Sequence, residues 1–135
     1  MLRGRCNCGA VRFEIAGRWS AIGQCHCSKC RKASGAASNA VLYTAARSLR
    51  FVAGEDRRRS FDLPSGWGTA FCSTCGSPLP RLHPNGKIFF VPAGLLDGDP
   101  GVKVERHIFV GSKASWDEIA GDAPRFEEDD PSLRR

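Results

Sequence analysis

Alternating apolar and polar positions predict short strands along most of the chain. The clearest case is residues 11–15, where Val11, Phe13 and Ile15 alternate with Arg12 and Glu14, the period of a half-buried strand. Similar extended segments are predicted at 40–43, 49–52, 58–63, 68–71, 77–79, 87–91 and 104–110. Because short strands dominate and helical periodicity is scarce, we predict a mainly β fold of short antiparallel sheets.

Helix signals are confined to two short stretches. Residues 28–34 could form a turn of helix capped by Ser28, and residues 115–119 could form another, with Ser115 as cap and Glu118 as its partner. The length of 135 residues suits one domain. We expect residues 1–126 to form that domain and residues 127–135, which begin with four acidic side chains, to be a loose tail.

Composition narrows the possible surroundings and partners. No stretch approaches the ~20 apolar residues of a membrane span, and the first residues lack the apolar core of a signal peptide. We therefore expect a cytoplasmic protein, monomeric or homodimeric, without a membrane partner. The formal net charge is +6, but apart from Arg57 to Arg59 and the Arg3/Arg5 pair the basic residues are scattered. Such dispersion argues against a nucleic-acid partner.

Seven cysteines provide the strongest chemical signal. They fall into three groups: Cys6/Cys8, Cys25/Cys27/Cys30 and Cys72/Cys75. An odd number excludes complete internal disulfide pairing, and clustered thiols in a reducing compartment are more often metal ligands. Zinc prefers such soft ligands and takes four of them at a closed structural site.

Four of the thiols can form one closed site. If strand geometry extends back from residue 11, Cys6 and Cys8 point to one face, and Cys72-x-x-Cys75-Gly76 has the form of a zinc knuckle. Those four cysteines would bind a structural zinc. The remaining Cys25, Cys27 and Cys30 leave a fourth position open, which is the pattern of a catalytic zinc. We therefore expect two zinc ions per chain, the second more labile.

Other readings of the central stretch stay open at this stage. Cys25 and Cys27 could instead pair with the Cys72/Cys75 knuckle. The central stretch could be a second inert site completed by one of the three histidines, His26, His83 or His107, or it could be a redox-active thiol trio. We expect His26 to point away from the metal and His107 to lie in the core.

Several other side chains near these motifs are candidates of lower specificity. Lys29, Arg31 and Lys32 flank the central cysteines and could bind an anion, although a solvated surface role is the simpler interpretation. Trp67 and Trp116 are expected to be packing residues.

An ordered set of motifs resembles a known family. The motifs are Cys-x-Cys-Gly-Ala-Val-Arg-Phe from Cys6, Cys-His-Cys-Ser-x-Cys-Arg-Lys-x-Ser-Gly-Ala from Cys25, Phe-Cys-x-x-Cys-Gly-Ser-Pro-Leu from Phe71, Ala-Gly-x-Leu-Asp from Ala93 and His-Ile-Phe-Val from His107. Residues 4–126 thereby resemble the family of glutathione-dependent formaldehyde-activating enzymes and centromere protein V, abbreviated GFA. Each block alone is weak, but their order is highly specific.

The family resemblance has implications for the fold and the activity that the spacing of the cysteines alone does not have. It implies a β-tent fold around a structural zinc at Cys6, Cys8, Cys72 and Cys75, and a catalytic zinc at Cys25, Cys27 and Cys30. It also implies a carbon–sulfur lyase that joins glutathione, or another thiol, to formaldehyde or a small aldehyde. The alternative is a zinc-stabilised binding module for nucleic acid or protein, because fold alone does not fix function.

Overall fold

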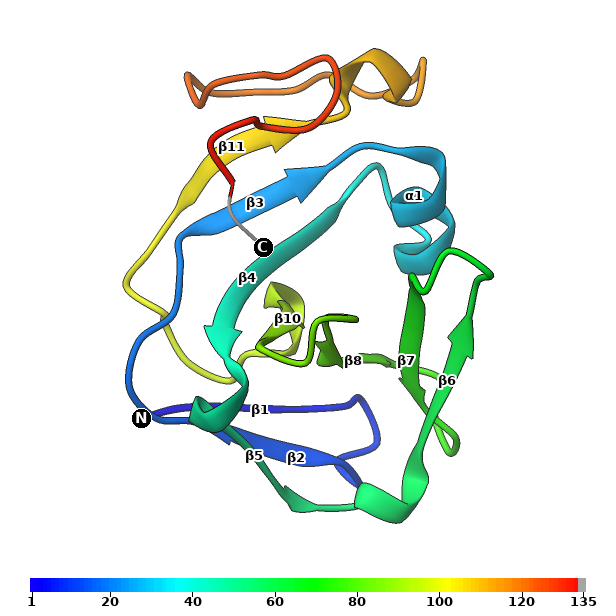
Figure 1. The fold of residues 1–135 in the computed structure, drawn as a ribbon, viewed down its shortest axis with the longest axis vertical. Helices are drawn as coiled ribbons and strands as arrows, with labels where there is room; N and C mark the ends of the chain where they lie inside the picture. The colour runs from blue at the N-terminus through cyan, green and yellow to red at the C-terminus, as the bar shows by residue number, and fades with distance from the viewer. Residues whose placement is uncertain (134–135) are drawn as a thin grey trace.

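The computed structural model describes residues 1–133 and is mainly β, with three small sheets and one short α-helix (Figure 1). The first sheet has the order β1-β2-β5 and consists of β1 (Leu2–Arg5), β2 (Arg12–Ile15) and β5 (Leu49–Ala53). The third has the order β6-β7-β8 and consists of β6 (Arg58–Asp62), β7 (Gly68–Cys72) and β8 (Pro78–Leu79). Both are antiparallel throughout, so the predicted fold class is confirmed.

The second sheet has five strands and crosses the middle of the molecule (Figure 1). Its order is β11-β3-β4-β10-β9, formed by β3 (Ile22–Cys25), β4 (Asn39–Ala45), β9 (Arg81–Leu82), β10 (Ile88–Pro92) and β11 (Val104–Ile108). The β11–β3 pair is parallel and the other pairs are antiparallel. A strand from the end of the domain therefore lies beside the strand that leads into the central cysteines.

The main core lies where the first sheet packs on one face of the second. Phe13 and Ile15 from β2, Leu42 from β4 and Val91 from β10 are at most 1% exposed and belong to one cluster. Burying a side chain of this size stabilises the fold by about 2 kcal/mol. The alternation predicted for residues 11–15 is confirmed, because Phe13 and Ile15 face this core and Arg12 faces solvent.

Three local expectations were wrong. Residues 115–119 form no helix: Ser115 and Trp116 are a turn and residues 117–119 are irregular. Trp116 is 71% exposed, so a short helix there would gain little from packing. The α-helix α1 (Ser28–Ser34) exists, but its N-cap is Cys27, whose sulfur accepts a hydrogen bond from the Cys30 N–H. Cys6 to Gly9 is a turn, not an extension of a strand.

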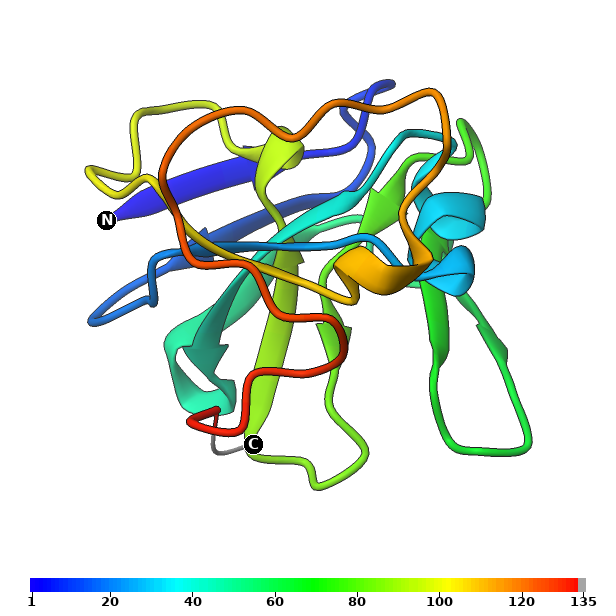
Figure 2. The same ribbon diagram turned by 90° about the horizontal axis from the view of Figure 1, so that it is seen from above.

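The acidic segment after Phe126 is in contact with the domain as far as Leu133. The Phe109 N–H donates to the Glu128 carbonyl over 2.8 Å, and Arg106 Nε lies 3.1 Å from the Asp130 carboxylate. Asp130 is only 6% exposed. Figures 1 and 2 show this orange-red segment running beside β11. Within residues 1–133, no helix is long and apolar enough to cross a membrane.

Candidate metal centres

The seven cysteines gather into two clusters. Within each, the sulfur atoms all lie within 4.8 Å of one another. The four-cysteine cluster contains Cys6, Cys8, Cys72 and Cys75, and the cysteine trio contains Cys25, Cys27 and Cys30. Among residues 1–133, no histidine or carboxylate joins either group. The alternative pairing of Cys25 and Cys27 with the Cys72/Cys75 knuckle is therefore not the one that the fold assembles.

Two matched turns build the four-cysteine cluster. The first follows β1 and is closed by a hydrogen bond from the Gly9 N–H to the Cys6 carbonyl; the second follows β7 and is closed from Gly76 to Cys72. Both glycines have positive φ, 77° and 76°, which a residue with a Cβ rarely adopts. The turns thus bring two pairs of sulfurs together although Cys8 and Cys72 are 64 positions apart.

The sulfur spacing in this cluster suits a tetrahedral metal ion. Cys6 Sγ lies 3.6 Å from Cys8 Sγ, and Cys8 Sγ lies 3.9 Å from Cys72 Sγ. Four sulfurs bound at ~2.3 Å in a tetrahedron would be about 3.8 Å apart. Cys6 and Cys72 are at most 2% exposed. Cys75 is half-buried and Cys8 is exposed, so these sulfurs could hold an ion close to the protein surface.

Ser77 joins the two turns of the four-cysteine cluster. Its hydroxyl oxygen accepts a hydrogen bond from the Asn7 N–H over 2.8 Å and lies 3.3 Å from Cys75 Sγ. The hydrogen bond with this hydroxyl lowers the pKa of Cys75 to about 5, helped by the Ser77 N–H. A thiol that ionises so readily is prepared for metal binding, because the thiolate is the ligand.

The cysteine trio is positioned by a strand end and a helix start. Cys25 is the last residue of β3 and pairs with Asn39 of β4 and Ile108 of β11. Cys27 is the N-cap of α1, and Cys30 lies in that helix. All three are half-buried. The trio thus depends on the ordering of three strands and one helix.

Two thiols of the trio, Cys25 and Cys30, differ in how readily they ionise. The hydrogen bond with the Cys30 thiol lowers the pKa of Cys25 to about 6, while burial and the Asp129 carboxylate act to raise it. The same hydrogen bond, together with burial, raises the pKa of Cys30. Cys25 therefore ionises more readily than Cys30, and a bound cation would favour ionisation of both.

His26 links the trio to β11 from the side away from its sulfurs. Its ring is 2% exposed, and its Nε2 lies 3.0 Å from Nδ1 of the buried His107. The backbone N–H of His26 donates to the Ile108 carbonyl, and its Nδ1 lies 3.8 Å from the Asp117 carboxylate. Burial lowers the pKa of both histidines. His26 thus supports the loop, and His107 is the core histidine that the sequence predicted.

The trio lines a cavity of about 860 Å³, which we call the main cavity. No member of the four-cysteine cluster lines it. Lys29 and Lys32 lie at its edge, whereas Arg31 turns away and donates to the Ser112 carbonyl. Asp129 and Leu133, from the acidic segment, also contribute to its wall. No motif or spacing in the sequence pointed to these two residues, because only folding of the segment along β11 brings them to the cavity.

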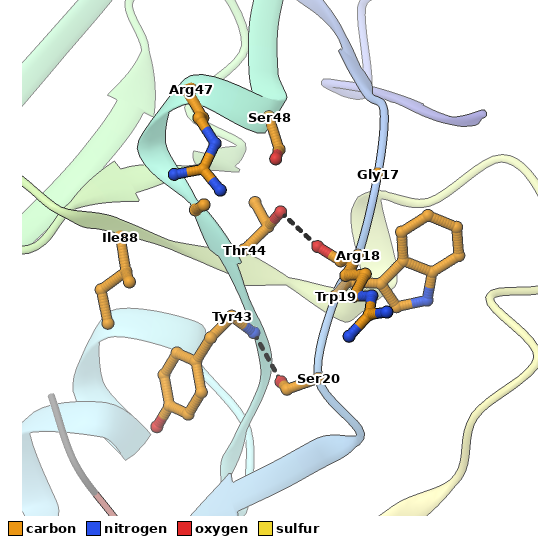
Figure 3. Close-up of a pocket in the computed structure, with 10 residues that line it drawn as sticks. Gly17, Arg18, Trp19, Ser20, Tyr43, Thr44, Arg47, Ser48 and Ile88 are labelled. Atoms are coloured by element: carbon orange, nitrogen blue, oxygen red, sulfur yellow. Dashed lines mark hydrogen bonds between the residues drawn. The ribbon is translucent and has the colours of Figure 1, made fainter.

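A second, smaller pocket of about 520 Å³ lies elsewhere on β4 (Figure 3). Its walls include Arg18, Arg47 and Ser48, and no cysteine lines it. Figure 3 shows the two hydrogen bonds that attach its edge to β4: the Thr44 hydroxyl donates to the Arg18 carbonyl, and the Tyr43 N–H donates to the Ser20 hydroxyl. This pocket holds no nucleophile or metal-binding group comparable to the trio.

Comparison with known proteins agrees with this geometry. The model of the family described as "Glutathione-dependent formaldehyde-activating enzyme" matches residues 1–112. A Halomonas elongata protein named "Putative glutathione-dependent formaldehyde-activating enzyme" is 31% identical over 127 residues, covering 88% of this chain and 81% of the relative. A crystal structure of a Rhodobacter sphaeroides protein superposes with a TM-score of 0.60 at 26% identity, covering 76% of this chain and 98% of the other. With its motifs, fold and cysteine clusters, the chain belongs to the GFA family.

Proposed function

We propose that this protein is a zinc-dependent carbon–sulfur lyase acting on the adduct of glutathione, or another thiol, with formaldehyde or a small aldehyde. The observation that carries the proposal is the position of the trio. Its three half-buried sulfurs line the main cavity, while the four-cysteine cluster does not. A three-ligand zinc site that opens on a cavity is typical of catalysis, and a four-ligand site is typical of structure.

The donor sets fit zinc at both positions. The four-cysteine cluster would hold a structural ion and the trio a catalytic one, because thiolates are the ligands that zinc prefers. When bound to the trio, zinc would supply a positive charge that polarises a carbonyl group or lowers the pKa of a thiol. The family model and the named relative support this assignment.

The proposed reaction is simple in its bond changes. In the synthetic direction the thiol sulfur attacks the aldehyde carbon, a carbon–sulfur bond forms as the carbonyl π bond breaks, and the thiol proton passes to the new hydroxyl oxygen. Lys29 and Lys32 at the cavity edge would attract the carboxylates of glutathione. The half-buried walls would hold the two reactants together, which replaces a bimolecular encounter by an oriented one.

The test compares variants of the two clusters in zinc content and turnover. Cys27→Ser should lose one zinc per chain and reduce lyase activity at least about 100-fold, while circular dichroism and the melting transition stay close to wild type. Lys103→Ala, at an exposed position outside the cavity, is the surface control and should keep both zinc and activity. The rate must exceed the spontaneous reaction measured without protein.

Two results would overturn the proposal. One is a protein that carries a single zinc and whose activity Cys27→Ser leaves unchanged. The other is a protein that carries two zinc ions but does not accelerate the reaction with any thiol–aldehyde pair tested, which would favour the binding-module alternative.

A further inference from the structure

One wall of the main cavity, which we call its floor, changes in chemical character along its length. The floor is one face of the five-stranded sheet, because its residues alternate along β4: Asn39, Val41 and Tyr43 line the cavity, whereas the side chains between them point away. Cross-strand pairing places Cys25 in the row of Asn39. It places Phe90 of β10 in the row of Tyr43.

The floor begins at the trio and ends at a group of aromatic rings. One row of floor residues lies between Asn39 and Tyr43, which are four positions apart along β4, a distance of about 13 Å. Between the ends, the floor consists of Gly23, Val41 and Pro92, paired across three strands. Arg106, paired with Gly23 across β11 and β3, also lines this row, but its guanidinium is held by Asp130. The rest of the row offers no charge and little hydrogen bonding to a ligand, so it favours an apolar chain lying along it.

The far end is formed by aromatic rings. Tyr43 and Phe90 meet edge to face with centroids 5.0 Å apart, and the Trp67 ring lies 5.4 Å from Phe90. Trp67 and Phe61, which also line the cavity, are 39% and 62% exposed and belong to neither core cluster. Exposed apolar side chains gathered around a cavity mark a ligand-binding surface.

The unpaired positive charge lies at the opposite end. Arg81, beside the aromatic rings, is already paired with Asp62 at 2.8 Å, and Arg106 is paired with Asp130. Lys29 and Lys32 on α1 line the cavity next to the trio, and neither takes part in the ion pairs found within residues 1–133. Asp129 approaches Cys25 from the tail side, so an anion would lie on the helix side.

We propose that the main cavity takes a thiol adduct whose aldehyde-derived carbon carries a long apolar substituent, such as an alkyl chain or an aryl-ended chain. This inference rests on the proposed lyase function. The anionic groups of the thiol lie toward Lys29 and Lys32, and the substituent lies along Val41 toward Trp67 and Phe90. The lyase would therefore accept fatty or aromatic aldehydes in addition to formaldehyde and small aldehydes.

The test measures binding instead of turnover. S-methyl-, S-butyl-, S-hexyl- and S-octylglutathione are inert thioether analogues of such adducts, and isothermal titration calorimetry of each against the zinc-loaded protein gives its affinity. We expect affinity to rise about twofold per added methylene as the chain is partly buried. S-octylglutathione should then bind roughly 100-fold more tightly than S-methylglutathione.

Variants of Trp67, Trp116 and Val41 test where in the cavity the apolar chain binds. Trp67→Ala should remove about tenfold of the S-octyl affinity and leave S-methyl affinity unchanged. Trp116→Ala is the matched control: Trp116 is 71% exposed and does not line the cavity, so both affinities should stay as in wild type. Val41→Phe, which narrows the floor midway, should likewise abolish the gain from long chains. Melting curves verify that each variant is folded.

The outcomes separate this inference from the lyase proposal. Equal affinities across the series, or a chain-length gain that survives both Trp67→Ala and Val41→Phe, would overturn the inference even if formaldehyde adducts are turned over. A chain-length gain that these variants remove would support it. If that gain occurs in a protein without any lyase activity, the proposed function fails while the apolar binding site stands.

Discussion

The four-cysteine cluster and the cysteine trio place the same side chain in different surroundings. In the four-cysteine cluster Cys6 and Cys72 are at most 2% exposed, Cys75 is half-buried and Cys8 is exposed, and the cluster joins two turns from distant parts of the chain. The trio is half-buried, lies within six residues and lines the main cavity. The number of sulfurs is therefore only part of the difference between the two clusters. What surrounds them decides whether a bound ion would serve folding or meet a ligand.

The largest effect should come from breaking the four-cysteine cluster. Cys72→Ser removes a ligand that is 1% exposed and sits at the end of β7. Loss of the metal would lower the free energy of unfolding by about 4 kcal/mol or more, a large part of the total for a domain. We expect little soluble, folded protein. Denaturant unfolding with zinc analysis measures this, and Cys27→Ser, which should remain folded, is the comparison variant.

Stepwise removal of metal with a chelator should empty the two clusters one after the other. A chelator such as EDTA should remove metal from the trio first, because three sulfurs facing the cavity leave a coordination position open to the chelator. One zinc and the activity should then be lost while the far-ultraviolet circular dichroism persists. The second zinc should leave only as the fold melts. Simultaneous loss of both ions and of structure would show that the clusters are not distinct in this way.

The histidine pair behind the trio predicts an acid-sensitive element of stability. Burial lowers the pKa of both His26 and His107, so they stay neutral in the folded protein when the unfolded chain, with a pKa of about 6.5, begins to take up protons. Stability from these neutral rings is therefore present above that pH and is lost as the pH falls below it.

Replacing one ring should reduce this loss. His107→Gln keeps a hydrogen-bonding group near His26 but removes one titrating site, so its free energy of unfolding should fall less steeply than that of wild type between pH 7 and pH 5. Chemical unfolding at several pH values gives the slope. Parallel slopes would mean that the pair does not contribute to acid sensitivity.

The smallest effect is expected at Ser77. Ser77→Ala removes the hydroxyl that accepts from the Asn7 N–H and contacts Cys75, at a cost of about 1 kcal/mol. Zinc affinity of the four-cysteine cluster should fall about tenfold, the range typical of a partner that supports a metal ligand. Competition with a coloured zinc indicator measures it. Ser73→Ala, an exposed residue of the same turn, should leave the affinity unchanged.

The sequence predicted the two sets of sulfurs because ligand spacing is local information. The Cys-x-Cys, Cys-x-Cys-x-x-Cys and Cys-x-x-Cys patterns each depend on a turn of a few residues, and the fold gathers the same sets. Most strands were also predicted, since β2, β4, β5, β7 and β10 carry clear apolar runs or alternation. The roles of the two clusters as structural and catalytic sites remain predictions.

What the sequence did not reveal depends on long-range pairing. β3 was missed because Ile22, Gly23, Gln24 and Cys25 are all half-buried and show no alternation. Trp67 was expected only to pack, yet it helps to form the aromatic end of the main cavity, because β4, β10 and the β6–β7 turn meet there. The cap of α1 was assigned one residue too late because a cysteine sulfur, not a serine hydroxyl, accepts the bond.

The parallel pairing of β11 with β3 has a consequence for the order of assembly during synthesis. The last ligand of the four-cysteine cluster is residue 75, so that cluster can close before β11 has been made. Cys25 and His26, in contrast, pair with residues 107 and 108, more than 80 positions later. Contacts of such high sequence separation form late. A chain emerging from the ribosome should therefore load its first metal ion at the four-cysteine cluster and complete the trio only when the domain is almost finished.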